Sequence, residues 1–321
     1  MYQLSVMPEK EIKIVRYEPG YREVWNNFNR KAVNGLFLFD RDYMEYHHDR
    51  FRDYSLLIFE QKHLLAIFPL NAASSTVYSH AGLTYGGIII SGRVKIHLYL
   101  RLFEAVINYL RQKGFAKLLY KTLPYIFHQS PTQEDQYALF LYRANLVSRK
   151  VYSCLYLQAE THYTKGRKWS LKKALQANLE LKESTDFNSF LQILETLLHD
   201  KYAAKPTHTA AEINYLALKF PDNIKLFVVY HQQKMIGGSI VYISRQVVHF
   251  QYIAITETGK KLHALDYIVH FLVQKYKATK KYLNFSSSVG DDIFGFNMGL
   301  IQNKESYGAR SLTQDIYELT L

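Results

Sequence analysis

The sequence has a single cysteine, Cys154, among its 321 residues. One thiol cannot form an intramolecular disulfide, and the lack of any cysteine pair excludes the usual structural zinc sites. The chain also lacks a run of the ~18 to 20 consecutive apolar residues that a membrane-spanning helix needs. Its start, MYQLSVMPEKE, carries acidic residues where a secretory signal would have an apolar core. We therefore expect a soluble, cytoplasmic protein with no integral membrane segment.

Acidic residues are few relative to basic ones, with 28 Asp and Glu against 40 Lys and Arg and a formal net charge of +12. Such a surface attracts polyanions, and nucleic acid, phosphorylated metabolites and anionic membrane faces all qualify. Charge alone does not choose among them. An apolar share of 48% excludes a disordered chain, and the length favours about two domains.

The two halves of the sequence repeat one order of elements. Each half begins with two helical segments, continues into a hairpin and a third strand, and then has a helix, a strand, a helix and a final strand. The third strand covers residues 76–90 in the first half and residues 247–255 in the second. The helices that follow have apolar stripes at Ile96, Leu100, Phe103, Ile107 and Leu110 and at Leu265, Ile268, Val269, Leu272 and Tyr276. We therefore expect two similar α/β domains, residues 1–160 and 161–321.

The string TETGKKLHA, residues 256–264, leads from an apolar strand directly into a helix. Backbone N–H groups at a helix start are unpaired and lie at the positive end of the helix dipole, which favours phosphate. Gly259 permits a tight curl of the backbone, and Lys260 and Lys261 add cationic donors for a pyrophosphate. The corresponding string of the first half, SGRVK, is shorter and less basic, so we assign the donor phosphates to the second half. An ordinary solvated turn is the alternative.

The order of elements, with its turn after VVHFQYIAI, resembles the GNAT acyltransferase fold, and its duplication resembles tandem FemAB-like transferases. Three strings are similar to segments of FemAB-related and polysaccharide-locus N-acyltransferases: HAGLTYGG at residues 80–87, RKWSLKKA at 167–174 and FGFNMGLIQNKESYGAR at 294–310. The resemblance implies an α/β (α+β) fold with two GNAT-like domains, each a mixed central sheet flanked by helices. It also implies transfer of an acyl group from an acyl-CoA donor to an amine. The second domain would then be the donor side and the first the acceptor side.

The resemblance further implies that the donor carbonyl lies near the splayed end of the third strand, where backbone N–H groups stabilise an oxyanion. The donor-binding residues that it implies are Tyr252, Ile253, Ala254, Ile255, Thr256, Gly259, Lys260, Lys261, His263 and Asn297. The family's pyrophosphate loop has Gln or Arg, then Gly, then Gly or Ala, where this sequence has Thr256, Gly259 and Lys261. This departure leaves a donor other than coenzyme A open.

Three residues are candidates for catalysis. Many single-domain family members carry an Asn and, seven residues later, a Tyr that protonates the leaving thiolate, whereas here Asn297 is followed by Lys304. Lys304 would stabilise a leaving group or acyl oxygen electrostatically, with an exposed helix lysine as the alternative. A general base must accept the proton of the attacking ammonium, and of His249, Glu257, Asp291 and Asp292 we assign His249 and Asp291 to this role. A buried core histidine and a helix cap are their structural alternatives.

For the acceptor substrate, the glycines Gly86 and Gly87 would let a ligand approach the strand, and Tyr85 offers a hydroxyl. A bulge would explain the two glycines equally well. Ser286 and Ser288, at the end of the strand KKYLNFSSS, are also assigned to the substrate.

No metal is expected. His47 and His48 are neighbours on a helix and face different ways, and no third and fourth ligand stands at a zinc-like spacing.

The acceptor that the resemblance implies is a small-molecule amine, on an amino sugar or a nucleotide- or lipid-linked cell-envelope precursor. A second hypothesis is transfer of an aminoacyl group from charged tRNA to a peptidoglycan precursor, which the phosphate-loop departures and the +12 charge favour. The sequence shows no sustained heptad arm of the kind that FemAB enzymes use for tRNA, which favours the thioester donor. A third hypothesis, of another class, is a non-catalytic duplicate that binds a polyanion or a partner.

Overall fold

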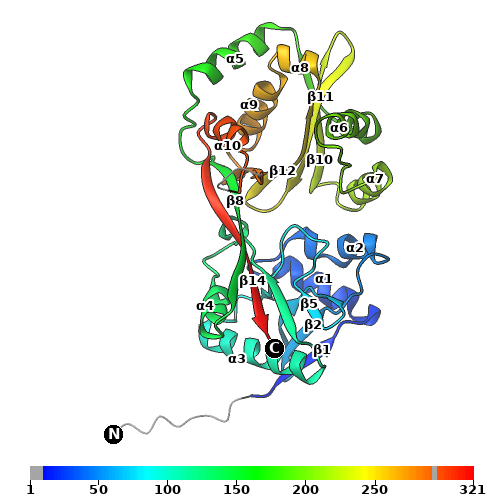
Figure 1. Cartoon of the computed structure of the whole chain (residues 1–321), viewed down its shortest axis with the longest axis vertical. Coiled ribbons are helices and arrows are strands. Elements are labelled where there is room, and N and C mark those ends of the chain that lie inside the picture. Colours follow the sequence, from blue (N-terminus) through cyan, green and yellow to red (C-terminus); the bar gives the residue numbers. More distant parts are fainter. Residues whose placement is uncertain (1–9, 291–294) are drawn as a thin grey trace. The chain divides into compact units, whose positions relative to one another are not determined.

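The computed structural model describes residues 10–290 and 295–321, apart from the side chains of residues 201 and 202. The chain divides into two compact units (Figure 1). Unit 1 is Met1–Arg149 with Gln314–Leu321, and unit 2 is Lys150–Thr313.

These units differ from the predicted domains, residues 1–160 and 161–321, because the last strand of the chain belongs to unit 1. Strand β14 (Arg310–Thr320) pairs antiparallel with β7 (Lys117–Lys121), and this pairing returns Gln314–Leu321 to unit 1. Strand β8 (Asn145–Tyr156) begins in unit 1 and ends in unit 2. The chain therefore passes from one unit to the other twice.

Unit 1 contains an antiparallel sheet in the order β1-β2-β3-β6 and a second group of strands in the order β4-β5-β7-β14. In the second group β5 and β7 are parallel and their other pairings are antiparallel. Its strands are β1 (Ile12–Arg16), β2 (Leu56–Glu60), β3 (His63–Phe68), β4 (Asn71–Ala73), β5 (Thr76–Tyr78), β6 (Ile89–Ile90) and β7 (Lys117–Lys121). Its helices are α1 (Arg22–Lys31), α2 (Arg41–Met44), α3 (Ile96–Gln112) and α4 (Glu134–Leu141), with 3₁₀ helices at Pro19–Tyr21, Phe37–Phe39, Glu45–His47 and Tyr125–Phe127.

Helix α3 confirms the apolar stripe predicted for the first half from Phe103 onward, whereas Ile96 at its start is 43% exposed. Its side chains Phe103, Ile107 and Leu110 are fully buried in one core with residues of β2, β3 and β7. The helix ends before Gly114, which adopts φ +80°, a conformation that glycine reaches without a steric penalty.

The single strand predicted over residues 76–90 is wrong. The structure has a short strand β5 at its start and a two-residue strand β6 at its end. Between them His80 has φ +56° and Gly87 has φ +95°, and these left-handed conformations interrupt an extended chain. At Gly87 a Cβ would also lie 3.0 Å from the hydroxyl of Tyr120, a tight contact that adds to the preference of this φ for glycine.

Unit 2 has strands in the order β8-β13-β12-β11-β10-β9, in which only β12 and β13 are parallel. Helices α6 and α7 cover one face of β10–β12, and α8 and α9 cover the other (Figure 1). The strands are β8 (Asn145–Tyr156), β9 (Glu180–Ser184), β10 (Ile224–His231), β11 (Lys234–Ile243), β12 (Val247–Ile255), β13 (Tyr282–Ser287) and β14 (Arg310–Thr320). The helices are α5 (Lys165–Gln176), α6 (Phe187–Tyr202), α7 (Ala210–Lys219), α8 (Glu257–Lys261), α9 (Ala264–Tyr276) and α10 (Met298–Glu305).

The stripe predicted for the second half forms the inner face of α9. Ile268, Val269 and Leu272 are fully buried against apolar residues of β10, β11 and β12. The two units thus confirm the fold prediction: each has a mixed sheet flanked by helices, and the order of elements is duplicated.

Candidate functional site

Strands β12 and β13 separate part of the way along their length. Their parallel register joins Val247 to Tyr282, Val248 to Leu283 and His249 to Asn284. No further pair follows among the described residues, although β12 continues to Ile255. Residues 250–255 therefore have a strand partner on one edge only, and the backbone groups that point toward β13 are left for a ligand or for water.

A β-bulge lies where the separation begins. On the β11 side, Val241 pairs with Phe250 and Ile240 pairs with Tyr252, so Gln251 is an extra residue with no partner. A bulge increases the local twist and turns backbone groups away from the regular ladder. Gln251, Tyr252 and Ile253 are partly exposed, whereas Phe250 is buried. Of the predicted donor residues, Tyr252 and Ile253 thus lie on this opening, while Ala254 and Ile255 are buried behind it.

On the β13 side, Asn284 shapes the end of the strand. Its side chain is fully buried, and its Oδ1 accepts a hydrogen bond of 2.9 Å from the backbone N–H of Ser286. Ser286 adopts φ +66°, and the register of β13 against β8 shifts between Asn284 and Ser287. The Nδ2 of Asn284 is buried and has no hydrogen-bond partner in the described part of the chain. An unpaired buried donor of this kind is unusual. A bound ligand or an ordered water next to Asn284 would satisfy it.

Lys304, on α10, reaches the same strand end. Its ammonium donates to the carbonyl oxygens of Ser286 at 3.0 Å and Ser287 at 2.9 Å and to Oγ of Ser288 at 2.7 Å. The residue is only 9% exposed, and burial lowers the pKa of the ammonium to about 8. All three protons of the ammonium are thus used within the protein, and they fix the segment that follows the strand opening.

His249 faces an environment that disfavours its charged form. The ring is buried, and burial together with the nearby charge of Lys304 lowers its pKa to about 3. A histidine with so low a pKa is a weak base. The structure thus brings together four residues that the sequence analysis assigned to separate roles, namely His249, Ser286, Ser288 and Lys304. In this arrangement the hydrogen bonds of Lys304 fix the backbone of residues 286 and 287.

Tyr252 and His208 form a contact that sequence reasoning missed. The hydroxyl of Tyr252 lies 2.7 Å from Nδ1 of His208 and accepts a hydrogen bond of 3.3 Å from its backbone N–H. His208 is 5% exposed and directly precedes Thr209, the N-cap of α7. The contact fixes the Tyr252 side chain on the opened part of β12. No local pattern links two residues that lie 44 positions apart.

The predicted donor turn folds into the short helix α8. The hydroxyl of Thr256 accepts from the backbone N–H of Gly259 at 3.1 Å and donates to the carbonyl of Ile236 at 2.8 Å. Gly259 is buried, and a Cβ there would lie 2.3 Å from the same Ile236 oxygen. The glycine is therefore required for packing against β11. Lys260 pairs with Glu257, and Lys261 remains exposed.

An ion pair anchors the start of α9. Arg167, on α5, donates from Nη1 to Asp266 at 3.1 Å and from Nε to the hydroxyl of Ser306 at 2.7 Å. Its guanidinium lies 4.3 Å from the centre of the Tyr307 ring. Asp266 is 4% exposed and stands in the first turn of α9, where a carboxylate interacts favourably with the helix dipole. Next to it, His263 has φ +57° and contacts the edge of the exposed Trp169.

The remaining predicted residues have other surroundings. The Oδ1 of Asn297 accepts from the backbone N–H of Leu300 at 2.9 Å and so caps α10. Asp291 lies outside the described residues. In unit 1, Tyr85 is 1% exposed and packs on Phe127, with ring centres 4.6 Å apart. A Cβ on its neighbour Gly86 would lie 2.2 Å from the carbonyl oxygen of Ser79.

No helix in the described part of the chain has the length and apolar content needed to cross a bilayer. Within residues 10–290 and 295–321, no three His, Cys, Asp or Glu side chains gather as metal ligands would.

The comparisons with known proteins show similarity of fold. No family model matches the sequence, and no curated protein matches it. Among solved structures, FemX has a TM-score of 0.65 at 8% identity, over 94% of this chain and 96% of that chain. The C-terminal domain of a protein assigned as a lysylphosphatidylglycerol synthetase, from Agrobacterium fabrum, has a TM-score of 0.60 at 8% identity, over 93% and 91%. A tandem GNAT protein from the clavulanic acid biosynthesis pathway has a TM-score of 0.54 at 11% identity, over 97% and 98%. This chain therefore has a two-domain GNAT-like, FemX-like fold.

Proposed function

We propose that the chain is a transferase that moves an acyl group to an amine at the opening between β12 and β13. The observation that carries the proposal is the separation of the strands after His249 and Asn284, together with the bulge at Gln251. An amine that attacks a thioester or ester develops negative charge on the carbonyl oxygen. Backbone N–H groups held in place by the flanking sheet are donors that need no reorganisation, so no particular side chain has to supply this stabilisation.

The donor that we propose first is an acyl-CoA. The exposed Lys261 and the first turn of α9 would receive its phosphates, because a helix start carries unpaired N–H groups. The amine acceptor that we propose is an amino sugar or a cell-envelope precursor, as the resemblance to FemAB-like and polysaccharide-locus transferases implies.

The second candidate is an aminoacyl donor. The fold neighbours include a protein whose name refers to lysylphosphatidylglycerol synthesis, and the turn at Gly259 is used for packing. The N–H of Gly259 is already bonded to Thr256, so it has no proton left for a pyrophosphate. Both observations favour a donor that does not depend on this loop, such as charged tRNA.

Calorimetry with acetyl-CoA and longer acyl-CoAs tests the first donor. We expect binding by the wild-type protein and at least tenfold weaker binding by Lys261→Glu, because the substitution reverses a charge beside the phosphates. Release of free thiol in the presence of an amino sugar would then report transfer. Failure of wild type and Lys261→Glu alike to bind any acyl-CoA would exclude this donor.

The same binding measurements are made with charged tRNA in place of the acyl-CoAs. If it is the donor, its affinity falls steeply with salt, because each phosphate contact releases counterions. Binding of either donor without transfer to any amine would instead support the non-catalytic hypothesis.

The bulge itself offers a sharper test than any side chain. Deletion of Gln251 would leave Phe250 opposite Val241 and Tyr252 opposite Ile240 in a regular ladder. We expect the protein to remain folded, with transfer reduced ~100-fold or more, which is the typical effect of losing an oxyanion donor. Equal activity of the deletion variant and the wild type would show that the bulged backbone takes no part in the reaction.

A further inference from the structure

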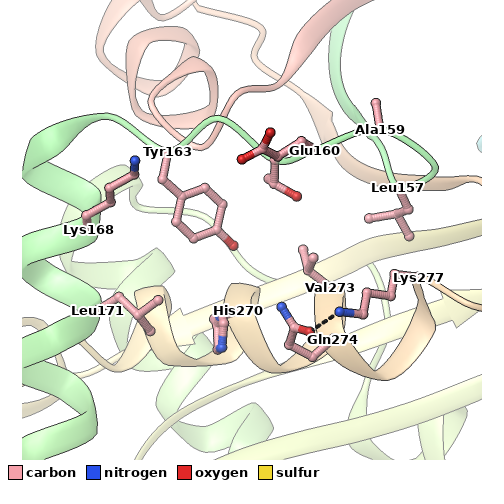
Figure 2. A pocket seen from close by; sticks show the side chains of 11 residues that line it. Leu157, Ala159, Glu160, Tyr163, Lys168, Leu171, His270, Val273, Gln274 and Lys277 are labelled. Carbon is pink, nitrogen blue, oxygen red and sulfur yellow. Dashed lines mark hydrogen bonds between the residues drawn. The ribbon is translucent and has the colours of Figure 1, made fainter.

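A cavity of 390 Å³ lies in unit 2 on the outer side of α9, between that helix, α5 and the segment that follows β8 (Figure 2). It is separate from the opening between β12 and β13, because its α9 residues belong to the second half of the helix. The lining includes Leu157, Glu160, Tyr163, Lys168, Val273 and Lys277. Its size is at the small end of the ~300 to 1,000 Å³ that ligand sites in proteins occupy.

The cavity combines an apolar wall with charged groups at its rim. Leu157 and Val273 are 6% and 4% exposed, and Leu171 lines the cavity at the end near Lys168 (Figure 2). Lys168 on α5 and Lys277 at the end of α9 stand at opposite ends (Figure 2). Such a mixture of an apolar surface and a few converging polar groups is typical of sites for small organic molecules.

The charges of the lining leave an excess of positive charge. Two lysines face one carboxylate, that of Glu160. Burial, and then the nearby Lys277, lowers the pKa of His270, so its ring is uncharged at neutral pH. None of the described residues forms an ion pair with Lys168, and the Nζ of Lys277 donates only to the neutral side chain of Gln274, at 2.5 Å. The lining therefore carries a net positive charge, which an anionic ligand would neutralise.

Tyr163 adds a second, independent observation. Its hydroxyl is buried, has no hydrogen-bond partner among the described residues, and points toward α9 (Figure 2). A buried hydroxyl without a partner is unfavourable, so a bound molecule or an ordered water usually satisfies it.

We propose that this cavity binds a small organic anion, an oxyanion group joined to a compact apolar group. Lys277 holds the oxyanion, Leu157 and Val273 contact the apolar part, and Lys168 at the opposite end adds to the positive potential of the cavity. The ligand's polar group also reaches the hydroxyl of Tyr163 when the exposed Gln274 side chain moves aside. The site is independent of acyl transfer, since none of its residues belongs to the strand opening.

The test uses hexanoate and hexyl phosphate as probes, with hexanol and hexylammonium as matched molecules that lack negative charge. Methyl NMR spectra of the full chain report the site directly, because Leu157, Leu171 and Val273 each carry methyl groups. We expect hexanoate to bind with a Kd on the order of 1 mM or tighter and to shift mainly these methyl signals. Hexanol and hexylammonium should bind at least tenfold more weakly. Tighter binding of hexyl phosphate than of hexanoate would identify a phosphate ligand, and the reverse order a carboxylate.

Three variants complete the test. Lys277→Gln should weaken hexanoate about tenfold and Lys168→Gln by a smaller factor, whereas Lys172→Gln, on the same helix as Lys168 but outside the lining, should not weaken it. The proposal is overturned if hexanol binds as tightly as hexanoate, if Lys277→Gln behaves like Lys172→Gln, or if the shifted signals lie elsewhere.

Discussion

Asn284 lies opposite His249 in the last register pair of the parallel strands β12 and β13, and both side chains are buried at the point where the strands separate. Beyond this pair Asn284 holds the backbone of Ser286 in a left-handed conformation. The opening is therefore built by the protein's own side chains, and its shape depends on the φ of one serine.

Substitutions of Ser286 test that dependence. Ser286→Gly should keep or slightly raise the free energy of unfolding, because glycine adopts φ +66° without a steric penalty. Ser286→Val should lower it by about 1 to 2 kcal/mol, because a β-branched residue is strained at positive φ. Urea unfolding of the two variants provides the measurement. Equal stability of the glycine and valine variants would mean that the segment can take another conformation.

Lys304 predicts a pH dependence of stability. Its pKa is about 8 in the folded protein and 10.5 in the unfolded chain. Between these values the unfolded chain binds more protons, so the free energy of unfolding rises with pH; below pH 8 both states are protonated and the cost of the buried charge is fully present. Relative to Lys304→Met, the wild type should gain up to about 3 kcal/mol from pH 7 to pH 10.5.

Urea titrations of the wild type and Lys304→Met at intervals of one pH unit measure this gain. The groups common to both proteins cancel in the difference. A difference that stays flat or falls with pH would show that the three hydrogen bonds keep the ammonium protonated throughout.

Gly259 and Gly166 form a matched pair of glycine substitutions. Gly259→Ala should destabilise α8 by about 2 kcal/mol or more, because its Cβ would lie 2.3 Å from a backbone oxygen. Gly166→Ala should stabilise the protein by about 0.5 to 1 kcal/mol, since nothing lies within 4 Å of its Cβ and alanine favours helix α5. Thermal unfolding of both variants measures these changes. A Gly259→Ala protein as stable as the wild type would contradict the requirement for glycine in the packing of α8 against β11.

The pair of Arg167 and Asp266 should show strong coupling. Arg167→Met leaves the carboxylate of Asp266 buried without its cation, which should cost about 3 to 5 kcal/mol. The double variant Arg167→Met with Asp266→Asn should recover part of that loss. As a control, Lys182→Met breaks an exposed pair with Glu180 and should change stability by less than about 1 kcal/mol. Additive effects of the two substitutions at Arg167 and Asp266 would contradict the coupling.

The duplicated order of elements could be predicted from local sequence patterns. The stripe from Ile96 to Leu110 and the stripe beginning at Leu265 each repeat with the helical period, and both gave helices, α3 and α9. The break in the strand predicted over residues 76–90 could not be predicted, because the sequence pattern does not show the left-handed conformations of His80 and Gly87.

The details of the site depend on contacts between distant residues. The string VVHFQYIAI alternates without any sign of a bulge, and Gln251 becomes an extra residue only through the register with β11. Lys304 was predicted to act on a ligand, but its three acceptors, 16 to 18 residues away in sequence, lie on a strand end whose course no local pattern specifies. Hydrogen bonds between such distant residues can be identified only from the three-dimensional structure.

The pairing of β14 with β7 has a consequence for synthesis of the chain on the ribosome. Residues 117–121 of β7 leave the ribosome long before residues 316–320 are made. Until then unit 1 exposes the backbone edge of β7, and unpaired edges of this kind promote association between nascent chains. Unit 1, although its sequence comes first, is therefore completed only after nearly all of unit 2 has been translated.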